Sequence, residues 1–177
     1  MNTGTEILRN CEEAAIHMRK NVLKLALMAG PTGAHLGGCL SIIEILAALY
    51  CGVMKIKPEN PKWEKRDRFI LSKGQGSLAH YTALEASRII SEEELFTYGQ
   101  NGGLLPCAAS FNPDLGIEYS NGTLGFGLTY AVGLAFASKK LYTHIMSMFY
   151  LVMGNVMRVR FGSQRCPHHI LNCLISL

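Results

Sequence analysis

Acidic side chains are missing from the last third of this 177-residue sequence: no Asp or Glu follows Glu118, although several Lys and Arg residues do. Proteins hold hard divalent cations mainly through carboxylate and other oxygen ligands. The segment beyond Glu118 therefore has no carboxylate side chain to offer to a metal ion.

Paired cysteines of the CxxC type are also missing, because the six cysteines lie at the scattered positions 11, 39, 51, 107, 166 and 173. This pattern argues against a zinc site and against a disulfide scaffold. A metal site made of Cys166, His168, His169 and Cys173 is disfavoured, since their spacing fits no zinc pattern. We expect a protein of a reduced, cytoplasmic compartment.

Three further absences narrow the class of protein. The net charge is only +4 and no compact Lys/Arg patch is present, so we expect no nucleic-acid partner. The N-terminal segment carries acidic residues early and no apolar core, which argues against a signal peptide. The apolar run 141–157 is interrupted by polar residues and falls short of the roughly 20 apolar residues of a membrane span. We expect no membrane partner, a membrane-anchored protein being the weaker alternative.

What is present is an alternation of helical and strand-like patterns typical of an α/β fold. We predict a three-layer parallel sheet with helices on both faces, incomplete at its C-terminal end. In such folds ligands bind beyond the carboxyl ends of strands, which here are the loops at 72–77 and from 154 onward. The predicted helices lie over 5–29, from a Ser41–Glu44 capping box to about Tyr50, over 78–90 and over 123–140, with a short helix capped by Ser91 and Glu94. The predicted strands lie over 68–72 and, buried, over 144–153, and a long loop is predicted over 99–122.

The stretch "GAHLGGCLS" places one imidazole, His35, among glycines between two apolar runs. Glycine weakens a helix. We therefore predict a loop that brings its backbone and one histidine close to a ligand. The alternative is a histidine that only forms hydrogen bonds within a turn.

Four stretches in this order resemble the N-terminal, thiamine diphosphate-binding half of transketolase, particularly the split type in which two subunits share the enzyme. They are "GAHLGGCLS", "DRFILSKGQGSLAHYTAL", "NGTLGFGLTYAVGLAFASKK" and "YLVMGN". The resemblance covers roughly residues 5–155, and the "LSKG" and "GTLGFG" forms favour transketolase over the related deoxyxylulose-phosphate synthases. It implies the thiamine diphosphate-binding fold, with a partial domain over 1–155.

The resemblance also implies a chemistry and its components. The family transfers a two-carbon ketol unit between sugar phosphates, using thiamine diphosphate and Mg²⁺. The activating carboxylate lies in the other half of the enzyme. A complementary C-terminal subunit is therefore expected as a partner, and a homo-oligomer is expected as well.

Several site residues follow from the resemblance. His35 matches the histidine that faces the substrate, where an imidazole can donate to a sugar hydroxyl and exchange protons. Gln75 stands where the family has a histidine that reaches the diphosphate; it keeps an N–H donor but cannot carry charge. Gly122, Thr123 and Leu124 match the segment that touches the cofactor, with a tightly packed helix start as the alternative. Lys73 is expected only to solvate its loop.

The resemblance breaks at the metal site. The family has a "GDG" motif after this strand, whose Asp helps to hold Mg²⁺. Here Gly154 is kept, but Asn155 and Val156 replace the Asp and the second Gly. Asn155 can still offer a carbonyl oxygen to the cofactor's metal ion, but a neutral one. We expect a Mg²⁺ site that is damaged.

Residues 156–177 form a divergent basic tail, which we hypothesise is read in a shifted frame. Codons can be chosen for Val159–Leu171 that regroup, after one added G, into G-S-V-W-E-P-A-M-S-A-P-H-I. This resembles the "GSVWEAAMSA" continuation of transketolases. The alternative is true divergence, and sequencing the gene decides: actual codons that do not regroup in this way would refute the shift.

Two functions remain open from the sequence. One is a transketolase N-terminal subunit that is active only with its partner. The other is a non-catalytic remnant that does not bind the cofactor productively.

Overall fold

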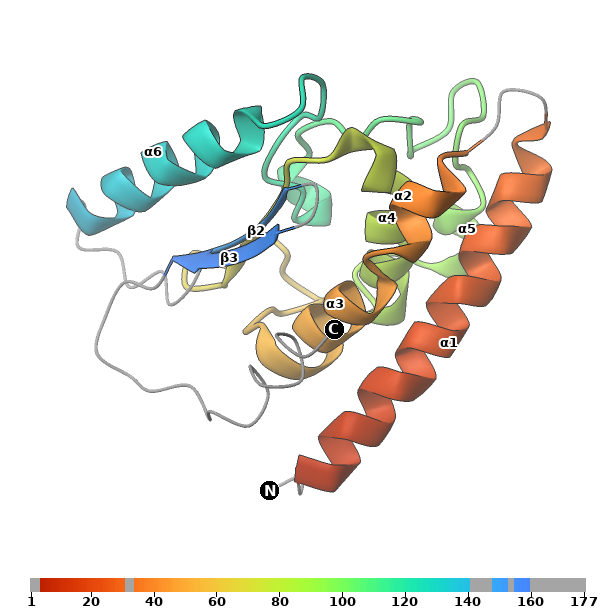
Figure 1. The fold of residues 1–177 in the computed structure, drawn as a ribbon, viewed down its shortest axis with the longest axis horizontal. Helices are drawn as coiled ribbons and strands as arrows, with labels where there is room; N and C mark the ends of the chain where they lie inside the picture. Colours follow the sequence, from red (N-terminus) through yellow and green to blue (C-terminus); the bar gives the residue numbers. More distant parts are fainter. Residues whose placement is uncertain (1–3, 31–33, 141–147, 153–154, 160–177) are drawn as a thin grey trace.

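The computed structural model describes residues 4–30, 34–140, 148–152 and 155–159, with helices packed beside a small sheet (Figure 1). Within these residues, each helix is too short or too polar to cross a membrane. The longer elements are the helices α1 (Gly4–Met28), α4 (Ser77–Ala86) and α6 (Phe126–Lys140) and the strands β1 (Arg68–Leu71), β2 (Met148–Val152) and β3 (Asn155–Val159). The short ones are α2 (Leu36–Leu40), α3 (Ile43–Ala48), η2 (Leu49–Val53), η3 (Gly74–Gly76), α5 (Glu92–Leu95) and η4 (Pro113–Leu115).

Helix α1 confirms the amphipathic pattern of the N-terminal segment. It buries one stripe, on which Met18, Val22 and Leu25 are almost fully covered. The helix ends at Met28, and Gly30 adopts a left-handed conformation at φ +59°, which glycine tolerates best. The inner stripe packs against α3 and α4 and closes one side of the core.

The segment after α1 differs from the prediction in two ways. Residues 36–40 form the short helix α2 rather than a loop, with His35 as its N-cap. Ser41 is the C-cap of α2, and its hydroxyl donates to the carbonyl of Gly38 rather than opening a capping box with Glu44. The reason is tertiary: Cys39 is buried against the loop after β1, and this packing outweighs the low helix propensity of the glycines.

The sheet has the order β1-β2-β3. Strands β1 and β2 are parallel, with Phe69 opposite Phe149, which confirms the predicted parallel pairing of these two strands. Strand β3 runs antiparallel to β2, so the parallel prediction is wrong at this edge, and residues 155–159 are a strand rather than a loop. Only an antiparallel partner can follow across so short a connection, because a parallel strand needs a crossover of a dozen or more residues.

The remaining elements follow their local sequence signals. The Ser91–Glu94 capping box of α5 is present in both directions, as predicted. Helix α4 ends at Ala86, four residues before the predicted limit. Helix α6 begins at Phe126, three residues later than predicted, because Gly125 adopts φ +88° just before it. The long loop over 99–122 contains the single turn η4.

Gly127 packs closely against Ser72, the residue that follows β1. A Cβ at this position would lie 2.6 Å from the Cβ and 2.8 Å from the Cα of Ser72, which follows β1. We therefore expect Gly127→Ala to lower the free energy of unfolding by about 1–3 kcal/mol, because the backbone must shift. Chemical denaturation measures this change.

Gly133 on the same helix provides the matched control. Its Cβ would meet no atom within 4 Å, so Gly133→Ala should be neutral or stabilise by up to about 1 kcal/mol through helix propensity. Equal effects of the two substitutions would contradict the close packing of α6 on the end of β1.

Candidate functional site

The carboxyl end of β1 gathers three segments that are far apart in the sequence. They are the loop 72–76 that follows the strand, helix α2, and residues 121–125 before α6. Gly127 donates its backbone N–H to the hydroxyl of Ser72 at 3.1 Å, which ties the start of α6 to the end of β1. This is the edge at which ligands bind in parallel α/β sheets.

Ser77 is the centre of a hydrogen-bond network at this edge. Its hydroxyl donates to the carbonyl of Gly74 at 2.7 Å and accepts from the backbone N–H of Ala109 at 3.0 Å and from the Asn121 amide at 3.2 Å. Because the hydroxyl proton of Ser77 is committed to Gly74, Asn121 must turn its NH₂ group toward Ser77. The Oδ1 atom of Asn121 is buried and accepts no hydrogen bond from the described residues.

Helix α2 lies directly against the loop after β1. A Cβ on Gly38 would lie 3.1 Å from the Cβ of Gln75, so glycine permits this approach. The Cys39 thiol donates to the carbonyl of Gln75 at 3.1 Å, and burial raises the pKa of this thiol. The side-chain oxygen Oε1 of Gln75 is also buried, and no group in the described part of the chain donates to it.

The residues predicted from the resemblance divide into those at this edge and those elsewhere. His35 is exposed at the N-terminus of α2, the helix that packs on Gln75. Gly122, Thr123 and Leu124 are exposed in the run that leads from Asn121 to α6. Asn155 is the first residue of β3, and Gly154 lies outside the described residues.

Lys73 is buried, against the expectation that it solvates its loop. The residue is only 6% exposed, and its ammonium group donates to the hydroxyl of Ser41 at 3.0 Å. Burial lowers the pKa of this amine. A signal was available in the sequence, since Lys73 follows the predicted strand by one residue and precedes Gly74 and Gly76, in the loop predicted to bind ligand.

The donor set for a divalent cation is poor. Among the residues that the structure describes, no three His, Cys, Asp or Glu side chains come together to hold a metal ion. Asn155, the one predicted ligand, offers a neutral amide oxygen, whereas Mg²⁺ prefers carboxylate and phosphate oxygens. The residues at hand therefore do not fit a protein-held Mg²⁺ ion.

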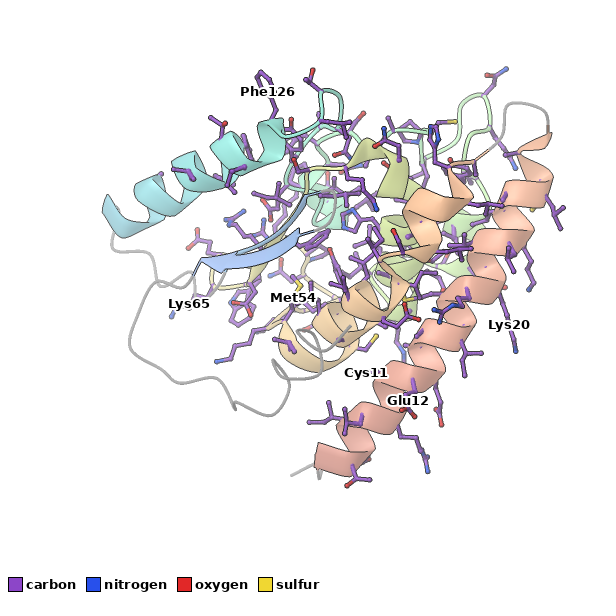
Figure 2. The ribbon with its side chains drawn as sticks, viewed as in Figure 1. Cys11, Glu12, Lys20, Met54, Lys65 and Phe126 are labelled. Carbon is purple, nitrogen blue, oxygen red and sulfur yellow. The ribbon has the colours of Figure 1, made fainter. Side chains whose placement is uncertain are left out.

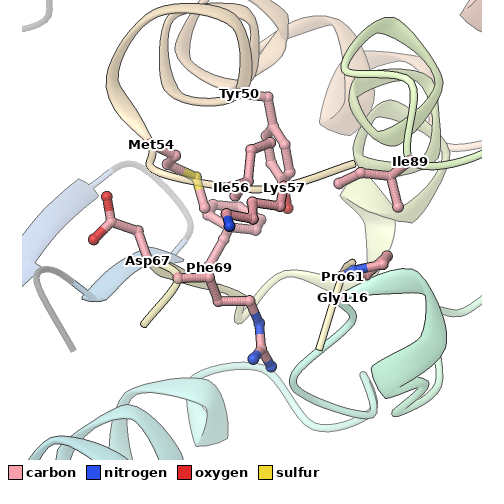
Figure 3. A pocket seen from close by; sticks show the side chains of 10 residues that line it. Tyr50, Met54, Ile56, Lys57, Pro61, Asp67, Phe69, Ile89 and Gly116 are labelled. Carbon is pink, nitrogen blue, oxygen red and sulfur yellow. The ribbon is translucent and has the colours of Figure 1, made fainter. Parts of the chain in front are cut away.

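A small hollow lies at the amino-terminal end of β1, around Tyr50, Phe69 and Gly116 (Figure 3). Its volume of about 20 Å³ leaves room for roughly one water molecule. This hollow is therefore too small for a cofactor.

Comparison with known proteins identifies the family of this chain. The family described as "Transketolase, thiamine diphosphate binding domain" matches residues 13–157. The 6-deoxy-6-sulfo-D-fructose transketolase subunit SqwG of Clostridium sp. (strain MSTE9) is 40% identical over 141 residues, which cover 78% of this chain and 50% of that protein. One subunit of the apulose-4-phosphate transketolase of Phocaeicola vulgatus is 41% identical over 124 residues, 68% of this chain and 42% of that protein.

Solved structures show the same relation. Transketolase from Leishmania mexicana superposes with a TM-score of 0.70 at 27% identity, covering 80% of this chain and 22% of that one. Transketolase from Campylobacter jejuni gives a TM-score of 0.68 at 27% identity, with 86% and 24% coverage. The chain thus spans about half the length of the curated subunits it matches, and less than a quarter of these two transketolase chains.

Proposed function

This chain belongs to the transketolase family through its thiamine diphosphate-binding domain, and we propose that it is the cofactor-binding subunit of a split transketolase. The observation that carries the proposal is the meeting of α2, the 72–76 loop and the 121–125 run at one end of β1. Two curated relatives are named as transketolase subunits, and this supports a two-subunit enzyme. The reaction we propose is two-carbon ketol transfer between sugar phosphates, in the cytoplasm.

We assign the site residues as follows. Gln75, Gly122, Thr123 and Leu124 would hold the cofactor, and Asn155, the first residue of β3, would approach its diphosphate. Gly154, which lies outside the described residues, is assigned to the cofactor from the resemblance alone. When bound, thiamine diphosphate supplies the nucleophilic carbon on which ketol transfer depends. The buried oxygens Gln75 Oε1 and Asn121 Oδ1 would accept from donor groups of the ligand other than its diphosphate, which offers only acceptors, because an unsatisfied buried acceptor costs free energy.

His35 would act on the substrate. Its exposed imidazole stands at the start of α2, beside the loop that carries Gln75. An imidazole in this place can donate a hydrogen bond to a sugar hydroxyl.

The partner protein is proposed to cover the exposed apolar face of α6. Phe126 is 63% exposed and points away from the sheet at the start of the helix (Figure 2), and Leu124 and Val132 are exposed as well. Around Phe126 and Tyr130 lies an open apolar hollow of about 470 Å³. Exposed apolar surface of this kind is typical of a protein interface. We propose that a second copy of the chain and the complementary C-terminal subunit contact it.

The finer architecture is proposed by analogy with the family. We infer a partial domain over 1–155 with a three-layer sheet, followed by a divergent tail over 156–177. The sheet face toward α6 and the face on which Phe69 contacts Tyr50 and His80 both carry helical segments, which supports the layering.

The alternative is a non-catalytic remnant, and Asn155 together with Val156 favours it. A thermal-shift experiment separates the two functions. A cofactor-binding subunit should unfold at a higher temperature with thiamine diphosphate than with thiamine, because a ligand that binds only the folded state stabilises it. A remnant should show no shift at millimolar cofactor. Turnover of a ketose donor after a complementary subunit is added would then establish the reaction.

A further inference from the structure

Lys73 carries a charge that no carboxylate of the described residues neutralises. Its side chain is 94% covered, and its stem passes Gly76, where an added Cβ would lie 3.5 Å from the lysine Cε. No carboxylate of the described residues lies within 4 Å of its ammonium group, and the remaining segments contain no Asp or Glu. The neighbouring Cys39 thiol, whose pKa burial raises, stays neutral and cannot serve as a counter-ion.

Burying such a charge is costly. Lysine is almost never fully buried unless it is paired with an opposite charge. The contrast with the arginines near β1 is clear, because the buried Arg66 and the partly buried Arg68 share the carboxylate of Glu118. A buried cation with one hydroxyl partner, in the loop at the carboxyl end of a strand, has spare donors for an anion.

We propose that Lys73 binds the phosphate group of a ligand at the carboxyl end of β1. The inference takes the identity of the ligand from the proposed function, and the phosphate belongs either to the diphosphate of the cofactor or to a sugar phosphate. The ammonium group is a compact charge with three donors, one of which is used by Ser41. No described residue accepts from the other two, which can make charge-assisted hydrogen bonds to phosphate oxygens.

The poor Mg²⁺ site strengthens this assignment. Where a carboxylate holds Mg²⁺, the metal ion neutralises a diphosphate. Here Asn155 supplies no charge and Gln75 none, so positive charge must come from another group at the same edge. Lys73 lies two residues before Gln75 and one residue before Gly74, where an added Cβ would lie 3.3 Å from the Cβ of Asn121. Binding of phosphate through Lys73 does not require a divalent cation.

The test compares the full chain with its Lys73→Met variant in EDTA, by calorimetry and by unfolding temperature. The probes are pyrophosphate, thiamine diphosphate, ribose 5-phosphate and, without phosphate, thiamine. We expect Lys73→Met to weaken binding of the phosphate probe concerned by about tenfold or more, as for a lost hydrogen bond to a charged group. Without ligand, its unfolding temperature should be equal or higher, because an unpaired buried charge is removed.

Lys20→Met, on the exposed face of α1 (Figure 2), is the matched control for loss of one charge and should bind as the wild type does. Weakened binding of pyrophosphate and thiamine diphosphate assigns Lys73 to the cofactor, and weakened binding of ribose 5-phosphate alone assigns it to the substrate. If Lys73→Met unfolds at a lower temperature but binds all phosphate probes as the wild type does, Lys73 only stabilises the fold through its hydrogen bond to Ser41. This result would overturn the inference.

The outcomes also separate this inference from the proposed function. Equal binding of all three phosphate probes by the wild type and Lys73→Met, with thiamine diphosphate among those bound, would overturn the role of Lys73 and leave the function standing. Binding of pyrophosphate that depends on Lys73, without any binding of thiamine diphosphate, would support the role of Lys73 and overturn the proposed function. A wild-type chain that binds none of the phosphate probes would refute both.

Discussion

Replacing Glu118 by Ala is expected to lower the free energy of unfolding by about 3–5 kcal/mol, the range for breaking a buried ion pair. Glu118 is 5% exposed, and its carboxylate accepts hydrogen bonds from the guanidinium groups of Arg66 and Arg68. Removing it leaves two largely buried cations without a counter-charge. Chemical denaturation of the purified variant measures the loss.

The hydrogen bonds of Glu118 to Arg66 and Arg68 also support the candidate cofactor site. Glu118 anchors the end of the 99–122 loop to the start of β1, four residues before Gly122, so the same variant should bind thiamine diphosphate more weakly. The matched control is Asp114→Ala in the same loop. Asp114 pairs with Lys62, but their side chains are 71% and 58% exposed, so the loss should not exceed about 1 kcal/mol. Similar small losses for both variants would contradict a buried network at Glu118.

His80 is expected to make the fold sensitive to acid. It is buried beside Phe69, and its Nε2 lies 2.7 Å from the hydroxyl of Tyr50. Burial lowers the pKa of His80 from 6.5 to about 3. Between these values the unfolded chain binds a proton that the folded chain excludes. Stability from His80 is therefore complete above pH 6.5 and is lost as the pH falls toward 3, by about 2 kcal/mol at pH 5.

The variant His80→Gln isolates this contribution, because glutamine can keep a hydrogen bond to Tyr50 but does not titrate in this range. The free energy of unfolding, measured at pH 7.5 and pH 5, should fall by about 2 kcal/mol less in the variant than in the wild type. His35→Gln, which changes an exposed imidazole, should keep the wild-type difference. If the wild type and His80→Gln lose the same free energy, a neutral buried His80 is ruled out.

The sequence predicted those elements that local patterns determine. Helix α1 follows from its apolar stripe, α5 from its capping box, and the parallel pairing of β1 with β2 from the apolar runs between helices. The errors arose where distant contacts decide. Residues 36–40 are helical because Cys39 and Gly38 pack on Gln75, and β3 exists because β2 offers an edge for antiparallel pairing. Neither contact is visible in a window of neighbouring residues.

The candidate site was predictable in position but not in its charges. The glycine-rich loop after a buried strand pointed to the carboxyl end of β1, and the structure places Gln75 there beside α2. Lys73 and Asn121 were missed because their importance depends on burial and on unused hydrogen-bond capacity. A lysine beside glycines usually lies in solvent, and only the packed structure shows that this one does not.

Calorimetric titration of the full chain with thiamine diphosphate, once with Mg²⁺ and once with EDTA, tests whether protein groups hold the diphosphate without a metal ion. We propose that protein groups at the carboxyl end of β1 hold the diphosphate and that Asn155 does not hold the metal ion. We therefore predict binding in both conditions with dissociation constants that agree within about threefold, a difference well under 1 kcal/mol. Binding that appears only when Mg²⁺ is present, or no binding in either condition, would contradict this proposal.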